Sequence, residues 1–152
     1  MGAITLTELK SRLDKLENGL NSIMQDAVSD TAKEFADLNR TQLTYGIGSD
    51  GKFLRKYKND AYKKKKQKMN NLPPFGVADL KVTGDFHKSI TVNPIATKAV
   101  PTATDDKTEL LIKYMGFSNA LGLNEDSLKK YRVILQPIVI RKFSEITKLE
   151  IR

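Results

Sequence analysis

The residue types that could support nucleotide chemistry gather in one glycine-rich segment, residues 46–52 (Gly-Ile-Gly-Ser-Asp-Gly-Lys). Its spacing matches a dinucleotide-binding fingerprint and also a P-loop as far as the lysine. A P-loop needs a serine or threonine next, to place a hydroxyl on magnesium, but Phe53 follows. Both motifs also require a buried strand immediately before them, whereas residues 38–44 are typical of the polar end of a helix. We therefore expect a glycine-rich turn and no nucleotide cofactor.

The residue types of a catalytic triad occur together at Asp85, His87 and Ser89. On a strand, neighbouring side chains of one face are about 6.6 Å apart, too far for the direct hydrogen bonds of a triad. His87 is the only histidine and there is no cysteine, so one chain offers no two-histidine metal site, no disulfide and no thiol nucleophile. The sequence thus predicts a solvent-facing polar row, no metal, no cofactor and no enzyme activity.

The elements that would carry these residues are predicted as antiparallel strands. Residues 77–82 and 86–92 are rich in β-branched and aromatic side chains, and Thr83-Gly84-Asp85 between them is typical of a tight turn. Residues 109–115 are a third strand candidate. The intervening residues 93–106 contain two prolines and are expected to form a loop or a long hairpin end.

Helices are predicted at both ends of the chain. Thr5 and Glu8 have the spacing of a capping box, and apolar side chains then recur at every third or fourth position to about Gln42. One straight helix of that length would span about 55 Å, more than the diameter of a small domain. We therefore expect Gly19 or the Ser29-Asp30 step to bend or split the helix. The helix either lies in the core or reaches a neighbouring subunit.

The last helix is expected to begin after Asn124 as N-cap and to kink or restart at Pro137. Together these elements predict one α+β domain over residues 1–152. In it, long N-terminal and C-terminal helices pack on a small antiparallel sheet, and a basic loop occupies about 44–74.

The formal net charge of +8 is concentrated in residues 52–68. This segment holds nine of the 26 basic side chains and one of the 18 acidic ones, so the remainder of the chain is neutral. Tyrosine and phenylalanine are interleaved with the cations, which suits either stacking on bases or anchoring to the core. Contact with DNA phosphates, contact with an acidic protein and a merely solvated loop all remain open. The candidate contact residues are Lys52, Arg55, Lys56, Lys58, Lys63, Lys64, Lys65, Lys66 and Lys68.

Three short motifs, in their order along the chain, resemble the tail-completion or neck (head–tail connector) proteins of tailed bacteriophages, in particular those of crAss-like phages. They are YGIGSDGKFLRKY with the lysine-rich stretch after it, LKVTGDFHKSITV, and GLNEDSLKKY. The second carries a Thr-Gly-x-hydrophobic-x-x-Ser-Ile signature. Its matching positions are Thr83, Gly84, Phe86, Ser89 and Ile90.

The resemblance implies a structural virion protein that forms a homo-oligomeric ring in the phage neck and joins the head or portal to the tail. Its partners would be copies of itself and portal, adaptor or tail proteins, with assembly in the host cytoplasm. A membrane role is not expected, because no apolar run approaches the roughly 18 residues of a spanning helix. The alternative is a small basic DNA-binding or packaging-accessory protein that uses the segment 52–68.

Overall fold

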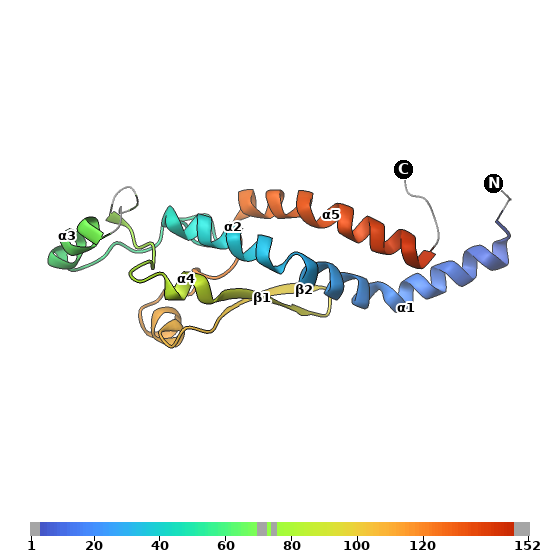
Figure 1. The fold of residues 1–152 in the computed structure, drawn as a ribbon, viewed down its shortest axis with the longest axis horizontal. Coiled ribbons are helices and arrows are strands. Elements are labelled where there is room, and N and C mark those ends of the chain that lie inside the picture. The colour runs from blue at the N-terminus through green and yellow to red at the C-terminus, as the bar shows by residue number, and fades with distance from the viewer. Residues whose placement is uncertain (1–3, 70–72, 74–75, 148–152) are drawn as a thin grey trace.

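The computed structural model describes residues 4–69, 73 and 76–147 and shows an elongated molecule (Figure 1). Residues 70–72 and 74, at the end of the predicted basic loop, lie outside this description. The elements are α1 (Leu6–Asp30), α2 (Ala32–Thr44), α3 (Asp60–Met69), α4 (Asp85–Ser89), β1 (Ile90–Ile95), β2 (Lys98–Ala103), the π-helix η2 (Leu110–Tyr114) and α5 (Glu125–Thr147).

Helix α1 begins at the predicted capping box. The Thr5 hydroxyl accepts the Glu8 amide at 3.2 Å, and the Glu8 carboxylate accepts the Thr5 amide at 2.9 Å. The helix is split at the predicted Ser29-Asp30 step, because α1 ends at Asp30 and α2 begins at Ala32, whereas Gly19 lies within α1. Thr31 separates α1 from α2, and its hydroxyl is 2.8 Å from the Tyr131 hydroxyl of α5.

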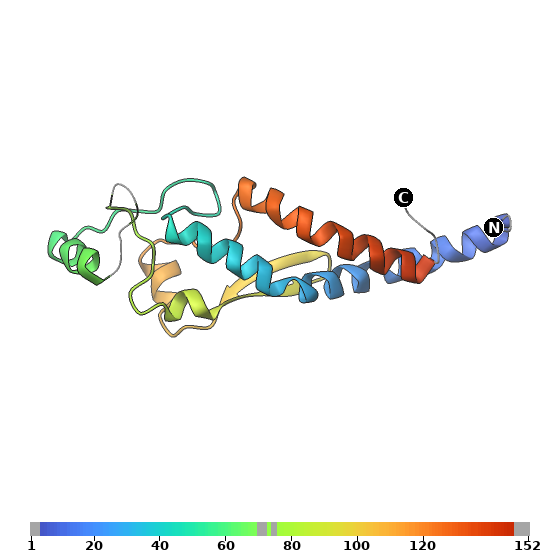
Figure 2. The same cartoon turned by 45° about the horizontal axis from the view of Figure 1, so that its top comes forward.

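The predicted α+β class is confirmed, with a sheet of two antiparallel strands, β1 and β2. Their register runs from the pair Ile90–Ala103 to the pair Ile95–Lys98. Helices α1 and α2 form a middle layer that packs on β1, and α5 lies along their other side (Figures 1 and 2). An ion pair of 3.0 Å between Lys142 and Asp30 links α5 to α1.

Three strand predictions are wrong. Residues 85–89 form the short helix α4, so the strand starts only at Ile90. Gly84 has a φ of +91°, and its carbonyl accepts the Lys88 amide at 2.9 Å, which starts a helical turn instead of a hairpin. Residues 77–82 contribute a single bridge, Lys56–Val77.

The third error concerns residues 109–115, where the π-helix η2 replaces the expected strand. The true partner of β1 is β2, which lies within residues 93–106. Residues 93–106 were predicted to form either a loop or a long hairpin end, and the hairpin is the correct prediction. Pro94 and Pro101 are both inside strands of a two-stranded ribbon, where one side of each strand needs no ladder donor.

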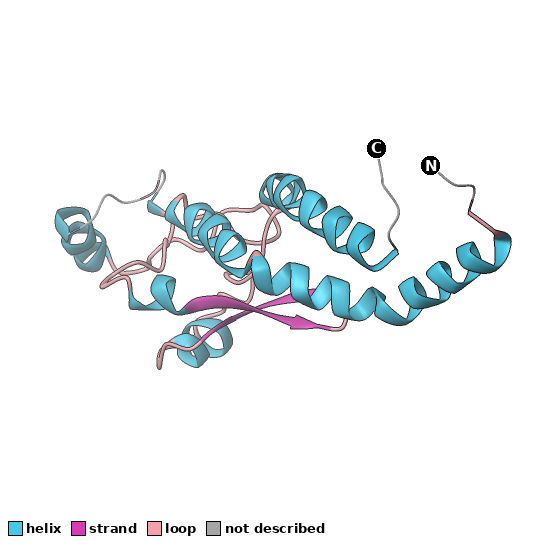
Figure 3. Cartoon of the chain, turned by 45° about the vertical axis from the view of Figure 1, so that its right-hand side comes forward, coloured by secondary structure: helices cyan, strands magenta, loops and turns pink. Residues whose placement is uncertain are grey.

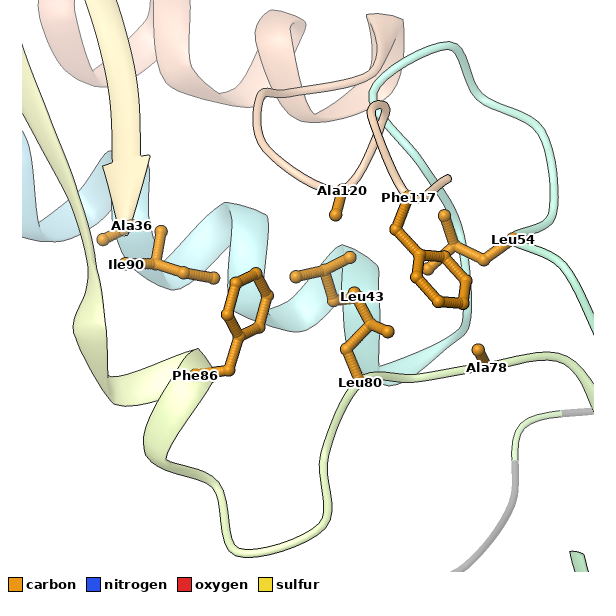
Figure 4. Close-up of a cluster of buried hydrophobic side chains, with 9 residues drawn as sticks. All are labelled: Ala36, Leu43, Leu54, Ala78, Leu80, Phe86, Ile90, Phe117 and Ala120. Atoms are coloured by element: carbon orange, nitrogen blue, oxygen red, sulfur yellow. The ribbon is translucent and has the colours of Figure 1, made fainter. Parts of the chain in front are cut away.

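The hydrophobic core consists of two clusters. The first joins α2, α4, β1 and the loop before α5, and Figure 4 shows its side chains meeting around Leu43: Ala36, Leu43, Leu54, Ala78, Leu80, Phe86, Ile90, Phe117 and Ala120. The second fixes α5 against the middle layer, where the Phe35 and Tyr131 rings meet edge to face with centroids 5.1 Å apart.

Helix α5 begins as predicted, with the side chain of Asn124 accepting the Ser127 amide at 2.9 Å. Pro137 lies inside α5, which continues as one helix to Thr147 (Figure 3). The predicted restart of the helix therefore does not occur.

Candidate partner-binding surfaces

The glycine-rich segment is a turn, as predicted. The Gly48 amide donates to the Lys52 carbonyl at 2.8 Å, and Ile47 and Phe53 form an isolated bridge. The turn is fixed to the loop before α5, because the Ser49 amide donates to the Asn119 carbonyl at 2.7 Å. The segment that precedes it is helix α2 and not a buried strand. This part of the chain therefore lacks the strand context of a nucleotide site.

The basic segment is partly helical, since α3 occupies residues 60–69. Most of its cations lie on the half of the molecule that ends in α3, at the opposite end from the start of α1 (Figure 1). Lys63 is half-buried and pairs with Asp60 at 2.8 Å. The exposed cations are Lys52, Arg55, Lys56, Lys58, Lys64, Lys65 and Lys68. We call these seven residues the basic surface.

Lys66 is the exception within the basic segment, because its side chain is 1% exposed and its ammonium group lies 3.0 Å from the carboxylate of Asp79. The ammonium also donates to the Lys81 carbonyl. The second carboxylate oxygen of Asp79 accepts the Tyr57 hydroxyl at 3.2 Å and the Lys81 amide at 3.1 Å. Lys66 therefore anchors α3 to the fold and is not available to a partner.

The sequence indicates which face of α3 carries Lys66, but not its partner. Tyr62 stands four residues earlier, so the two side chains share one face of α3. The Tyr62 ring packs edge to face on Tyr57, with centroids 4.9 Å apart. Burial, and then the charge of Asp79, raise the pKa of the Tyr57 hydroxyl. These two aromatic residues are anchors, whereas Tyr45 and Phe53 are 59% and 54% exposed.

The Thr-Gly-x-hydrophobic motif has a structural role. Phe86 and Ile90 belong to the first core cluster, and Gly84 supplies the positive φ before α4. The Thr83 hydroxyl donates to the Asp85 carboxylate, and the Ser89 hydroxyl donates to the Phe86 carbonyl at 2.9 Å. Each polar side chain of the motif thus bonds locally and stabilises the short helix.

The predicted solvent-facing row is wrong for His87. Because α4 is helical, His87 turns inward, is 6% exposed, and its Nε2 lies 2.7 Å from the Asp79 carbonyl. Since a carbonyl only accepts, Nε2 carries the proton. Burial lowers the pKa of the imidazole. His87 is therefore a neutral core residue, away from the Asp85 and Ser89 bonds described above.

A cavity of about 670 Å³ lies beside α3, between residues 55–62, 80–86 and 105–117. Its lining is largely apolar. We call its buried lining residues Leu80, Phe86 and Phe117 the floor, and its exposed cations Arg55, Lys56, Lys58 and Lys107 the rim. Sequence reasoning missed this site because its walls come from three separate segments. No local sequence pattern indicates that these three segments lie together in the fold.

The first half of α1 is a second surface. Over residues 6–22, all of them described, no side chain is buried. Leucines at 6, 9, 13, 16 and 20 alternate in steps of three and four, the a and d positions of a heptad. Leu6, Leu13 and Leu20 are 86%, 50% and 46% exposed. We call these five leucines the leucine seam.

No family model matches this chain, and no curated protein and no solved structure is similar to it. Within the described ranges, no cluster of histidine, aspartate and glutamate could hold a metal ion. In the same part of the chain, no helix is long and apolar enough to cross a membrane.

Proposed function

We propose that this chain is a structural subunit of a phage neck that joins the head or portal to the tail as part of a ring. The observation that supports this most is the separation of two surfaces along an elongated molecule (Figure 1). The leucine seam occupies one end, and the basic surface occupies the other half. A subunit with distinct surfaces at its two ends can contact its copies through one and a different protein through the other.

The leucine seam is assigned to contact between copies. The seam leucines, three exposed and two half-buried, occupy a and d positions and bury their remaining apolar area when a like helix packs on them. Arg12 and Glu17 flank the seam at g and e positions, where opposite charges favour a parallel neighbour. Repetition of one such contact around an axis closes into a ring when the rotation closes.

The basic surface is assigned to the next protein of the neck. Exposed cations, most of them on one half of the molecule, attract an acidic surface and accelerate the encounter with it. The buried pair of Lys66 and Asp79 holds α3 in place, and α3 carries Lys64, Lys65 and Lys68 of the basic surface. The position of this part of the basic surface is thus fixed by the fold.

Sedimentation velocity of the purified chain tests the role of the seam. We expect an oligomer of defined size for the natural chain and a monomer for Leu13→Glu, because a carboxylate in the seam cannot be buried unpaired. Val133→Glu is the matched control, since Val133 is 74% exposed on α5. The proposal fails if Leu13→Glu sediments like the natural chain, or if the natural chain is monomeric at every concentration.

A DNA-binding or packaging-accessory role is the second candidate. It is favoured by the 59% exposure of Tyr45, an aromatic residue near the basic segment in the sequence, because exposed aromatic rings can stack on bases. It predicts that fluorescence anisotropy detects binding to free duplex DNA that weakens steeply with salt. Lys64→Gln with Lys65→Gln would weaken this binding and leave folding unchanged. Absence of binding to duplex at low salt would exclude this candidate.

A further inference from the structure

The cavity beside α3 has the size and the rigid floor of a binding pocket. Its volume of about 670 Å³ lies within the range of roughly 300–1,000 Å³ that is typical of ligand sites. Leu80, Phe86 and Phe117 line it and also belong to the first core cluster (Figure 4). A bound group would therefore rest on side chains that the core already holds in place.

Several apolar side chains around the cavity remain exposed. Val82, Leu110 and Met115 are 41%, 51% and 46% exposed, and all three line the cavity. They come from two segments, residues 80–86 and 105–117, that the fold brings together. Exposed apolar side chains gathered around one hollow are typical of a protein contact site.

The rim of the cavity is cationic. Arg55, Lys56, Lys58 and Lys107 line it against one acidic residue, Asp105. The guanidinium of Arg55 lies close to Gly116, where an added Cβ would be 3.0 Å from Nη1. Gly116 thus leaves room for Arg55 at the edge of the apolar hollow. An apolar floor below a positive rim is complementary to an apolar group flanked by negative charges.

We propose that this cavity binds an acidic peptide segment of a partner protein, with one bulky apolar side chain in the hollow and carboxylates on the four rim cations. This inference deepens the proposed function, because it names the chemistry of the partner at the basic half of the molecule. A buried aromatic or aliphatic anchor surrounded by charge contacts is the usual form of an interface hot spot.

A nucleic-acid base fits this cavity less well. The hydroxyl of Tyr57 in the lining already donates to Asp79, and the lining is otherwise largely apolar. The polar edges of a base that enters the hollow would meet mainly apolar side chains and lose most of their hydrogen bonds to water, which is costly. An apolar side chain carries no such groups. The observations therefore favour a peptide over DNA as the occupant.

The test uses the full chain and a fluorescein-labelled peptide, acetyl-Asp-Glu-Trp-Leu-Glu-Asp-amide, in fluorescence anisotropy. Two control peptides replace either the tryptophan and leucine by serine or the four acids by lysine. We expect saturable binding of the first peptide and a loss of affinity of about tenfold or more for each control. Equal binding of the serine peptide, or no binding of the first peptide, would overturn the inference.

Substitutions of lining residues test whether the peptide binds in the cavity. Leu110→Glu should weaken the tryptophan peptide about tenfold or more, because it puts a carboxylate into the hollow. Val133→Glu introduces the same side chain at an exposed apolar position of α5 and should leave the affinity unchanged. Lys107→Glu should weaken binding, and Lys98→Glu, an exposed lysine on β2, should not. Equal effects of a variant and its control would refute the assignment.

Sedimentation of the same samples separates this inference from the proposed function. Leu110→Glu should keep the oligomer of the natural chain, since Leu110 is not part of the leucine seam. An intact oligomer that never binds the peptide refutes the cavity assignment alone, whereas peptide binding by a monomer refutes the self-contact alone. Displacement of the peptide by duplex DNA, but not by unlabelled peptide, would show that the site takes nucleic acid instead.

Discussion

Substitution of Lys66 by methionine is expected to destabilise the chain strongly, although Lys66 belongs to a run of four lysines. Met keeps the length of the side chain and removes the charge, leaving the 2% exposed carboxylate of Asp79 without its cation. Breaking a buried ion pair from one side typically costs about 3–5 kcal/mol. Asp79 retains hydrogen bonds from Tyr57 and from the Lys81 amide, so we expect about 3 kcal/mol, the lower end of that range.

Substitution of the other partner, Asp79→Leu, should lower the free energy of unfolding further. It leaves a 1% exposed ammonium with only the Lys81 carbonyl, and it also removes the acceptor of the Tyr57 hydroxyl and the Lys81 amide. We expect about 5 kcal/mol, the upper end of the range. The double variant should lose less than the sum, because neither charge is then buried alone.

Urea denaturation followed by circular dichroism measures these differences, and thermal melting gives a second readout. For a chain of this size, about 3 kcal/mol corresponds to a fall in Tm of roughly 6–12 °C. Lys65→Met is the matched control, since Lys65 is the exposed neighbour in the same run and should change stability by less than about 0.5 kcal/mol. If Lys66→Met and Lys65→Met unfold alike, Lys66 is not buried in an ion pair.

Three smaller perturbations test other parts of the fold. Gly84→Ala should cost about 1–2 kcal/mol in urea denaturation, because the φ of +91° disfavours a Cβ, whereas Gly19→Ala inside α1 should not destabilise. Unfolding free energy should fall as pH drops below about 6.5, because burial lowers the pKa of His87 and only the unfolded chain then binds the proton. A flat profile, or the same slope in His87→Gln, would contradict this. Tyr131→Phe removes the buried hydroxyl contact with Thr31 and should cost about 1 kcal/mol, so unchanged thermal melting would count against that bond.

Local signals in the sequence predicted the helices at the two ends of the chain, but not α3, α4 or η2, which replace a predicted loop and predicted strands. The capping box at Thr5, the break after Ser29-Asp30 and the N-cap at Asn124 each depend on a few neighbouring residues. Capping and apolar periodicity are short-range properties and can be read from the sequence. The same holds for the turn at residues 46–52, whose glycines define it locally.

The strand predictions failed where long-range contacts decided the conformation. Residues 86–92 alternate like a strand, yet Phe86 and His87 are both buried. Phe86 packs in the first core cluster, and His87 contacts the carbonyl of Asp79. The segment 109–115 is largely apolar, but among the described residues no strand pairs with it. Propensity for a strand has no effect without a partner to complete the ladder.

The candidate site was predictable only in part. The concentration of charge in residues 52–68 is a property of the sequence, and most of these cations are indeed exposed. The internal role of Lys66 depends on Asp79, which stands thirteen residues later with no pattern connecting the two. The cavity depends on contacts between three segments and was invisible for the same reason.

The connector proposal places the chain in phage particles, and quantitative mass spectrometry of such particles, purified and nuclease-treated, tests it most directly. The proposal predicts that the chain is present at a fixed number of copies per particle, as a ring requires. Absence of the chain from such particles would contradict it and would direct attention to free DNA as the partner of the basic surface.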